Sequence, residues 1–108
     1  MTSEQDIEKE IQDKGLNHPR LTPEHIDNAI RSEQYHVFEG TTLTVCVLTL
    51  KNGYSVTGES AAVSADNFDE EIGRRIAREN ARNKIWQLEG YLLRQKLYEK
   101  SGPVTSEV

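Results

Sequence analysis

The sequence predicts an α+β fold with a short N-terminal helix, a three-stranded antiparallel β-meander and a long C-terminal helical segment. Three observations lead to this prediction. Thr22-Pro23 is a helix-start signal. Residues 43–50 are rich in β-branched side chains and end at Asn52-Gly53. Residues 69–99 contain no proline and repeat apolar side chains at helical spacing. For a chain of 108 residues we expect a single domain, over residues 21–99.

The two ends of the chain are expected to lie outside this domain. Residues 1–20 are mostly charged and amide side chains, so we expect a disordered tail there. The alternative is a weakly amphipathic turn or two built on the apolar side chains at positions 7, 11 and 16. Residues 100–108 are expected to form a flexible tail, because Ser-Gly-Pro at 101–103 interrupts the helical pattern. Between the tails, the first helix should start with Thr22 as its N-cap and run to about Ser32.

The three strands follow from the pattern of apolar and turn residues. Residues 35–38 are predicted as the first strand, residues 39–42 as a turn, and residues 43–50 as a second strand. The second strand is apolar on both faces, which is typical of a central strand. Asn52-Gly53 then predicts a type I′ hairpin turn, in which both central residues have positive φ. The return strand runs from Tyr54 to about Val63 and alternates its side chains.

The long helix is predicted to begin after a cap at Asp66 or Asp69 and to extend past the sheet. At 1.5 Å per residue, residues 69–99 span about 45 Å, whereas the hairpin strands reach about 30 Å. One apolar stripe of the helix suits the sheet, and a second stripe contains Trp86, Leu93 and Leu97. We therefore expect a homodimer or a higher oligomer that covers the second stripe. The alternative is that the first helix or the N-terminal tail covers it.

The charge balance limits the classes of partner. The chain has 13 basic and 18 acidic residues and a formal net charge of −5, which disfavours duplex nucleic acid and anionic membranes as partners. No apolar run is long enough for a membrane span, and the polar N-terminus is unlike a signal peptide, so we expect a cytoplasmic protein. Five of the eight basic residues in segment 70–108 lie between Arg74 and Lys84. Such a local cationic cluster suits a small anion.

The arginines of this cluster are spaced for one face of a helix. Arg75, Arg78 and Arg82 follow an i, i+3, i+7 pattern, and Arg74 precedes Arg78 by one turn. They occupy the first turns of the predicted helix, where backbone N–H groups and the helix dipole favour bound anions. The alternative is a solvated face whose arginines pair with nearby glutamates.

Amide and aromatic side chains accompany the arginines. Guanidinium groups bind phosphate, amides can hydrogen-bond the ribose and base edges, and a flat ring can stack on a base. These three kinds of side chain together predict a nucleotide-binding site. Its candidate residues are Asn67, Phe68, Arg74, Arg75, Arg78, Asn80, Arg82 and Trp86.

Patterns typical of catalysis or metal binding are weak. The histidines at positions 18, 25 and 36 are scattered and have no metal-ligand spacing. Cys46 lies in the middle of the central strand, where we expect a buried and inert thiol. Glu59 and Glu79 could form a carboxylate pair, but their separation is not fixed by the sequence. We therefore expect no enzymatic activity, no metal and no cofactor.

Residues 22–97 also resemble a family of small tailed-phage and prophage proteins. The matching segments are YHVF at 35–38, GTTLTVC at 40–46, LTLKNG at 48–53, TGESA at 57–61, NFDEEIG at 67–73 and KIWQLEGYLL at 84–93. This family looks like the one that contains Thoeris anti-defence protein one.

The resemblance implies a non-enzymatic phage protein that acts in the host bacterial cytoplasm and blocks an immune system. Such a protein would bind the cyclic ADP-ribose isomer made by the defence TIR enzyme and hold it away from its effector. Relatives are credited with holding cyclic oligonucleotides in separate pockets of a hexamer. Carried over to this sequence, the ligand site would use Arg74, Arg78, Asn67 and Phe68, with Arg75 and Arg82 as alternates.

Two other functions stay open. A phage protein–protein inhibitor or assembly accessory would turn its acidic sheet toward a host protein and would ignore nucleotides. A nucleic-acid-binding protein would use the arginine ridge, and its affinity for oligonucleotides would depend steeply on salt.

Overall fold

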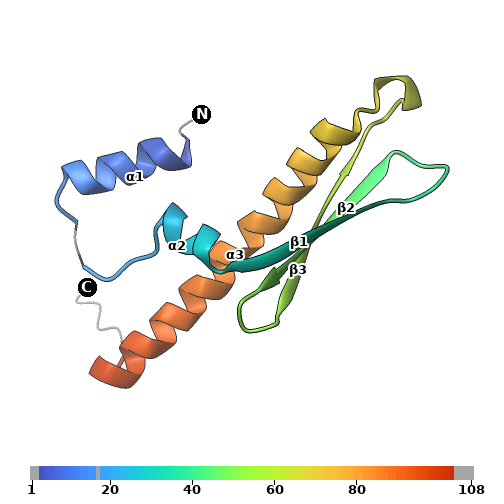
Figure 1. Ribbon diagram of the computed structural model, residues 1–108. Coiled ribbons are helices and arrows are strands. Elements are labelled where there is room, and N and C mark those ends of the chain that lie inside the picture. The colour runs from blue at the N-terminus through green and yellow to red at the C-terminus, as the bar shows by residue number, and fades with distance from the viewer. Residues whose placement is uncertain (1–2, 17, 104–108) are drawn as a thin grey trace.

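The computed structural model describes residues 3–16 and 18–103, and it confirms the α+β fold class. In chain order the elements are α1 (Glu4–Asp13), α2 (Pro23–Asn28), β1 (Ile30–Val37), β2 (Leu43–Leu50), β3 (Ser55–Ala61), the 3₁₀ turn η1 (Ala65–Asn67) and α3 (Glu70–Ser101). The strands form one antiparallel sheet in the order β1-β2-β3, and α3 runs along it (Figure 1). None of the helices described is both long and apolar enough to cross a membrane.

Side-chain caps fix where α2 and α3 begin. Thr22 Oγ1 accepts a hydrogen bond from the His25 backbone N–H at 3.1 Å, and Pro23 occupies the first turn of α2. Asp69 Oδ1 accepts from the Ile72 backbone N–H at 2.9 Å and caps α3. Thr22 was predicted as a cap, and Asp69 was one of the two caps predicted for the long helix, the other being Asp66.

The β2–β3 turn differs from the predicted type I′ turn. Gly53 has a φ of 91°, but Asn52 does not have a positive φ. The Leu50 carbonyl accepts from the Gly53 N–H at 2.9 Å, and the Leu50 N–H donates to the Tyr54 carbonyl at 2.7 Å. These bonds close a three-residue hairpin loop between Leu50 and Tyr54, and its last residue, Gly53, is the one with positive φ. The Asn52 side chain supports it by accepting from the Tyr54 N–H at 3.0 Å.

The first strand starts earlier than predicted, and the preceding helix is shorter. α2 ends at Asn28 rather than near residue 32, and β1 begins at Ile30 rather than at residue 35. β1 pairs with β2 from Ile30 opposite Leu50 to Val37 opposite Thr44, with one shift of register between Ile30 and Ser32. The exposed polar side chains at 31–34 concealed this edge strand, because only one of its faces meets the core.

The N-terminal segment also differs from the expectation. Residues 4–13, part of the segment expected to be a disordered tail, form α1. Ser3 caps this helix in a capping box, because its hydroxyl accepts from the Asp6 N–H at 3.1 Å and its own N–H donates to the Asp6 carboxylate at 3.4 Å. At the other end, α3 continues past residue 99 and stops at Gly102, whose φ is 81°. The rest of the expected C-terminal tail, residues 104–108, lies outside the described residues.

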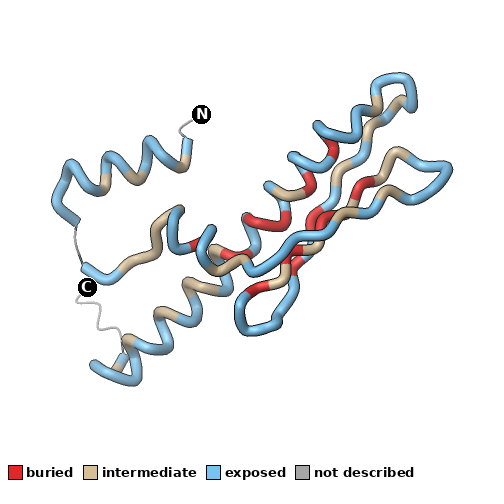
Figure 2. Tube along the Cα trace, viewed as in Figure 1, coloured by how far each residue is buried: buried red, intermediate tan, exposed pale blue. Residues whose placement is uncertain are grey.

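The core lies between α3 and the sheet, and Figure 2 shows the buried residues gathered there. Small side chains on α3, Ala77 and Ala81, let the helix approach the sheet closely. A Cβ added at Gly58 of β3 would lie 2.2 Å from the Ala77 carbonyl oxygen, so only glycine fits beneath the helix. The buried apolar residues are Ile26, Cys46, Leu48, Leu50, Val56, Ala77, Ala81 and Ile85.

α3 is longer than the sheet that supports it, as predicted. Its 32 residues correspond to about 48 Å, against about 26 Å for the eight-residue strand β2. Figure 1 shows its C-terminal part extending beyond the strands. Apolar side chains are uncovered on this part: Tyr91 is 75% exposed, and Leu88 and Leu92 are exposed as well.

The second apolar stripe of α3 is half-buried. Trp86, Leu93 and Leu97 all keep only part of their surface in contact with solvent. The N-terminal segment contributes to this cover, because a Cβ added at Gly90 would lie 3.7 Å from Leu21 Cδ1. The segment before α2 therefore provides some of the cover that we had expected a second copy of the chain to provide.

Candidate functional site

The eight predicted site residues do not meet in one cleft of the chain. The structure divides them among three places around α3, and each place has its own geometry and charge. The first group, which we call the arginine strip, consists of Arg74, Arg75 and Arg78. The second group is Arg82 with Trp86, and the third is Asn67, Phe68 and Asn80.

The arginine strip lies on the first turns of α3, where Arg74 and Arg78 contact β1 and Arg75 is exposed. Arg74 Nη2 donates to Glu70 Oε1 at 2.8 Å, and its guanidinium carbon lies 5.5 Å from the centroid of the Tyr35 ring. Arg78 Nε donates to Glu33 Oε2 at 2.6 Å. The side chains of Arg74 and Arg78 are 52% and 36% exposed, and exposed ion pairs contribute only about 0–1 kcal/mol. An anion from solution can therefore compete for these guanidinium groups.

Two residues of the sheet near the strip, Tyr35 and Cys46, have raised pKa values. Burial raises the pKa of Tyr35 to about 12, so its phenol stays protonated at neutral pH. Burial also raises the pKa of the Cys46 thiol, which lies opposite Tyr35 in the sheet register. Cys46 is buried as predicted, and a thiol with a raised pKa is a poor nucleophile. The strip thus offers cations beside an aromatic ring.

Arg82 is buried and fully engaged within the chain. Its Nη1 and Nη2 donate to the two carboxylate oxygens of Glu4 at 2.7 and 2.8 Å, and its Nε donates to Asp27 Oδ1 at 2.8 Å. Nη2 also donates to the Pro23 carbonyl at 3.2 Å, and Trp86 Nε1 donates to Glu4 Oε2 at 3.2 Å. The hydrogen bonds to Glu4 are the main cause of a raised pKa for Arg82. Arg82 and Trp86 therefore hold α1 and α2 against α3.

The third group lies on the β3 side of α3, away from the arginines. Asn80 Nδ2 donates to the Glu59 carbonyl of β3 at 2.8 Å, so this amide holds helix and sheet together. Asn67 and Phe68 line a small cavity of about 100 Å³ beside Ile72 at the start of α3. The cavity is too small for a nucleotide, and neither amide faces the arginine strip.

Larger clefts border the N-terminal segments. A cleft of about 450 Å³ lies between α1 and α3, with Trp86 and Asn83 on one side and Ile7 on the other. Glutamates at positions 4, 8 and 79 also line it, so a free anion meets negative charge there. The eight predicted residues contribute only Trp86 to this cleft.

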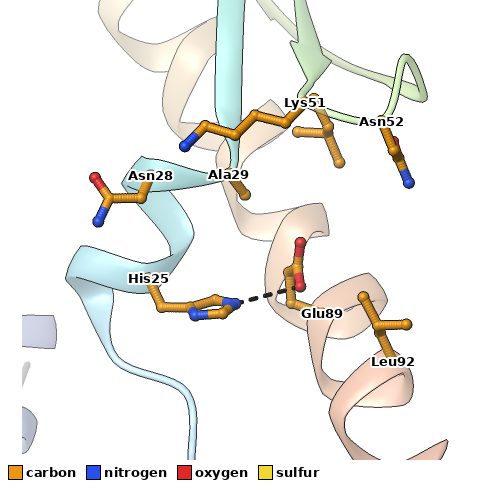
Figure 3. A pocket seen from close by; sticks show the side chains of 8 residues that line it. His25, Asn28, Ala29, Lys51, Asn52, Glu89 and Leu92 are labelled. Carbon is orange, nitrogen blue, oxygen red and sulfur yellow. Dashed lines mark hydrogen bonds and ion pairs between the residues drawn. The ribbon is translucent and has the colours of Figure 1, made fainter. Parts of the chain in front are cut away.

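Sequence reasoning missed the cleft in Figure 3. It has a volume of about 340 Å³ and is lined by α2, the β2–β3 turn and α3. His25 Nε2 and Glu89 Oε2 approach to 3.3 Å, and the side chains of Lys51 and Asn52 extend from the turn above them. These residues come from three distant parts of the chain, so no local pattern could have grouped them. His25 and Lys51 are the basic side chains in the lining of this cleft, and Glu89 is the carboxylate.

The comparisons with known proteins identify a family but no characterised relative. No curated protein and no solved structure matches the chain significantly. Residues 21–97, well over half of the chain, match the family described as phage protein (N4 Gp49/phage Sf6 gene 66). This range begins just before α2 and covers the whole sheet and most of α3. The chain therefore belongs to this family of phage proteins.

Proposed function

We propose that this phage protein is a non-enzymatic anti-defence protein that binds a cyclic nucleotide immune signal and keeps it from its effector. The observation that carries the proposal is the accessibility of the arginine strip. A cyclic ADP-ribose isomer, the ligand implied by the resemblance described above, is the first candidate, and cyclic oligonucleotides are a second class. Bacterial Thoeris-type signalling is the pathway that such binding would block.

The chemistry of the strip matches a compact dianion. Arg74 and Arg78 are one turn apart, and their present partners, Glu70 and Glu33, are themselves largely exposed. Replacing an exposed carboxylate by a phosphate costs little, because each pair is worth about 0–1 kcal/mol. Tyr35, which already lies against the Arg74 guanidinium, offers an aromatic surface beside the phosphates. Sequestration at nanomolar concentration requires about −12 kcal/mol, which a few charge-assisted hydrogen bonds and one stacked base can supply in a preformed site.

A second copy of the chain is expected to complete the site. The clefts described above do not include the arginine strip, so one chain offers only one wall. The C-terminal part of α3 presents Leu88, Tyr91 and Leu92 to solvent, an apolar surface that suits association. We propose a homodimer or a higher oligomer, up to a hexamer, with the ligand bound between subunits.

Calorimetry with the cyclic ADP-ribose isomer tests the ligand directly. We expect saturable heat at micromolar protein and a loss of about 10- to 150-fold in affinity for Arg78→Ala, since each charge-assisted bond is worth about 1.5–3 kcal/mol. Arg94→Ala is the matched control, because it removes the same charge from an exposed position on the same helix. No heat with the wild-type chain, or equal losses in both variants, would contradict the proposal.

A protein–protein inhibitor or assembly accessory is the second candidate, and the uncovered apolar residues favour it. Tyr54 at the β2–β3 turn and Tyr91 on α3 are both well exposed, and aromatic side chains are enriched at protein interfaces. This function predicts that the chain forms a stoichiometric complex with one host protein and that Tyr91→Ser abolishes the complex. It also predicts no response to nucleotides in the calorimetric experiment.

A further inference from the structure

The Glu4 carboxylate occupies a well-formed anion-binding site made by α3. Both carboxylate oxygens accept from the Arg82 guanidinium at 2.7 and 2.8 Å, and one of them also accepts from Trp86 Nε1 at 3.2 Å. Two-point binding of this kind recognises carboxylate and phosphate groups equally well. We call these donors the Arg82–Trp86 cradle.

The cradle is built independently of α1. Arg82 is 8% exposed, and its Nε is held by Asp27 of α2 at 2.8 Å while Nη2 also donates to the Pro23 carbonyl. These contacts come from α2 and its first residue, so they keep the guanidinium oriented when Glu4 leaves. Trp86 packs against the core from its own position on α3.

α1 itself is held weakly. None of its residues is buried, and Ile7, which faces the cleft between α1 and α3, is 48% exposed. Its links to the rest of the chain are two carboxylates one turn apart: Glu4 in the cradle, and Glu8, which accepts from Arg20 at 2.6 and 2.8 Å. A helix attached mainly by ion pairs, with Ile11 as its one half-buried apolar side chain, is at the low end of local stability.

We infer that the Arg82–Trp86 cradle is a second anion-binding site, which α1 fills with the Glu4 carboxylate until a phosphate-bearing ligand displaces it. Displacement leaves the phosphate on Arg82 and Trp86, and the rest of the ligand then lies against Leu21 and Pro23, the apolar residues outside α1 that line the cleft. The ligand class is therefore a phosphate ester with an apolar or aromatic body. α1 acts as an internal competitor that lowers the affinity for such ligands.

This inference goes beyond the proposed function, because it involves neither the arginine strip nor a second copy of the chain. Asp27 and Glu79 stay near the cradle after Glu4 leaves, so the site keeps negative charge at its edge. Free inorganic phosphate, which has no apolar body to offset this repulsion, is expected to bind much less well than an aryl phosphate.

Phenyl phosphate is the probe, and Trp86, the one tryptophan of the chain, is the reporter. We expect phenyl phosphate to change Trp86 fluorescence with a millimolar constant in the wild type and at least fivefold more tightly in Glu4→Gln. Glu10→Gln is the matched control: it removes one carboxylate from the same helix at an exposed position that pairs only with Lys14 among the described ion pairs. Its affinity for phenyl phosphate should equal that of the wild type.

Hydrogen exchange supplies a second readout on the intact chain. Saturating phenyl phosphate should lower the protection of amides in α1 while leaving the amides of β2 unchanged. No fluorescence response in any variant, equal affinities in Glu4→Gln and Glu10→Gln, or unchanged protection of α1 would each overturn the inference. Arg78→Ala should leave this response intact, so failure here and failure of the proposed function are distinguishable.

Discussion

Arg78 and Arg82 lie one turn apart on α3, yet their surroundings are opposite. Arg82 is 8% exposed and is bound by groups from α1 and α2, whereas Arg78 is 36% exposed and has a single carboxylate from β1. Helical spacing places side chains on a common face, but the segments packed on that face decide whether a cation is buried or accessible. In the folded chain, Arg82 holds the N-terminal helices, whereas Arg74 and Arg78 are exposed to solvent.

The largest expected effect on the free energy of unfolding comes from replacing the buried Arg82. Arg82→Ala leaves the carboxylates of Glu4 and Asp27 without their partner and should lower the free energy of unfolding by about 3 kcal/mol, at the low end for a broken buried pair. Both carboxylates keep contact with water, which limits the loss. Urea denaturation measures it. A loss below about 1 kcal/mol would mean that the ion pairs of Arg82 contribute no more to stability than exposed pairs such as that of Arg78.

An intermediate effect on the free energy of unfolding is expected at high pH from Tyr35, which lies against Arg74. The folded-state pKa of Tyr35 is raised from 10.0 to about 12 by burial. The stability that the neutral phenol contributes is therefore fully present below pH 10 and is lost as the pH rises toward 12. Unfolding free energies measured from pH 9 to 11.5 should fall more steeply for the wild type than for Tyr35→Phe. Identical slopes would mean that Tyr35 is well solvated in the folded chain.

The smallest effect is expected at the Arg78–Glu33 pair itself. A double-mutant cycle with Arg78→Ala and Glu33→Ala should give a coupling energy of about 1 kcal/mol or less, because both side chains are substantially exposed. The same cycle with Arg82→Ala and Asp27→Ala is the comparison and should give a larger value. A coupling above 2 kcal/mol for Arg78 and Glu33 would show that this arginine is committed to the fold and is not free for a ligand.

Features encoded by neighbouring residues could be predicted from the sequence. The central strand at 43–50, the caps Thr22 and Asp69, and the long helix past the sheet all depend on side chains within a few positions of each other. Gly53 likewise marked the hairpin, although the turn type was wrong because Asn52 avoids positive φ. Local preference and periodicity suffice where the partner of a residue is close in the chain.

Features that depend on distant partners could not be predicted. α1 has few apolar residues and is held through Glu4, whose partner Arg82 is 78 positions away. β1 is an edge strand with an exposed polar face, so its first half looked like the end of a helix. The spacing of the arginines indicated one shared site. Only the fold revealed that Arg82 is bound by the carboxylates of Glu4 and Asp27.

The distance in sequence between Glu4 and Arg82 has a consequence for synthesis. α1 leaves the ribosome before Arg82, its anchor on α3, has been made. The sheet and α3 must come together before the guanidinium is in place, since Asp27 and Pro23 orient it. Long-range contacts of this kind form late. α1 is therefore made before α3 but docks only after Arg82 is in place, and until α1 docks the chain presents Arg82 without its Glu4 partner.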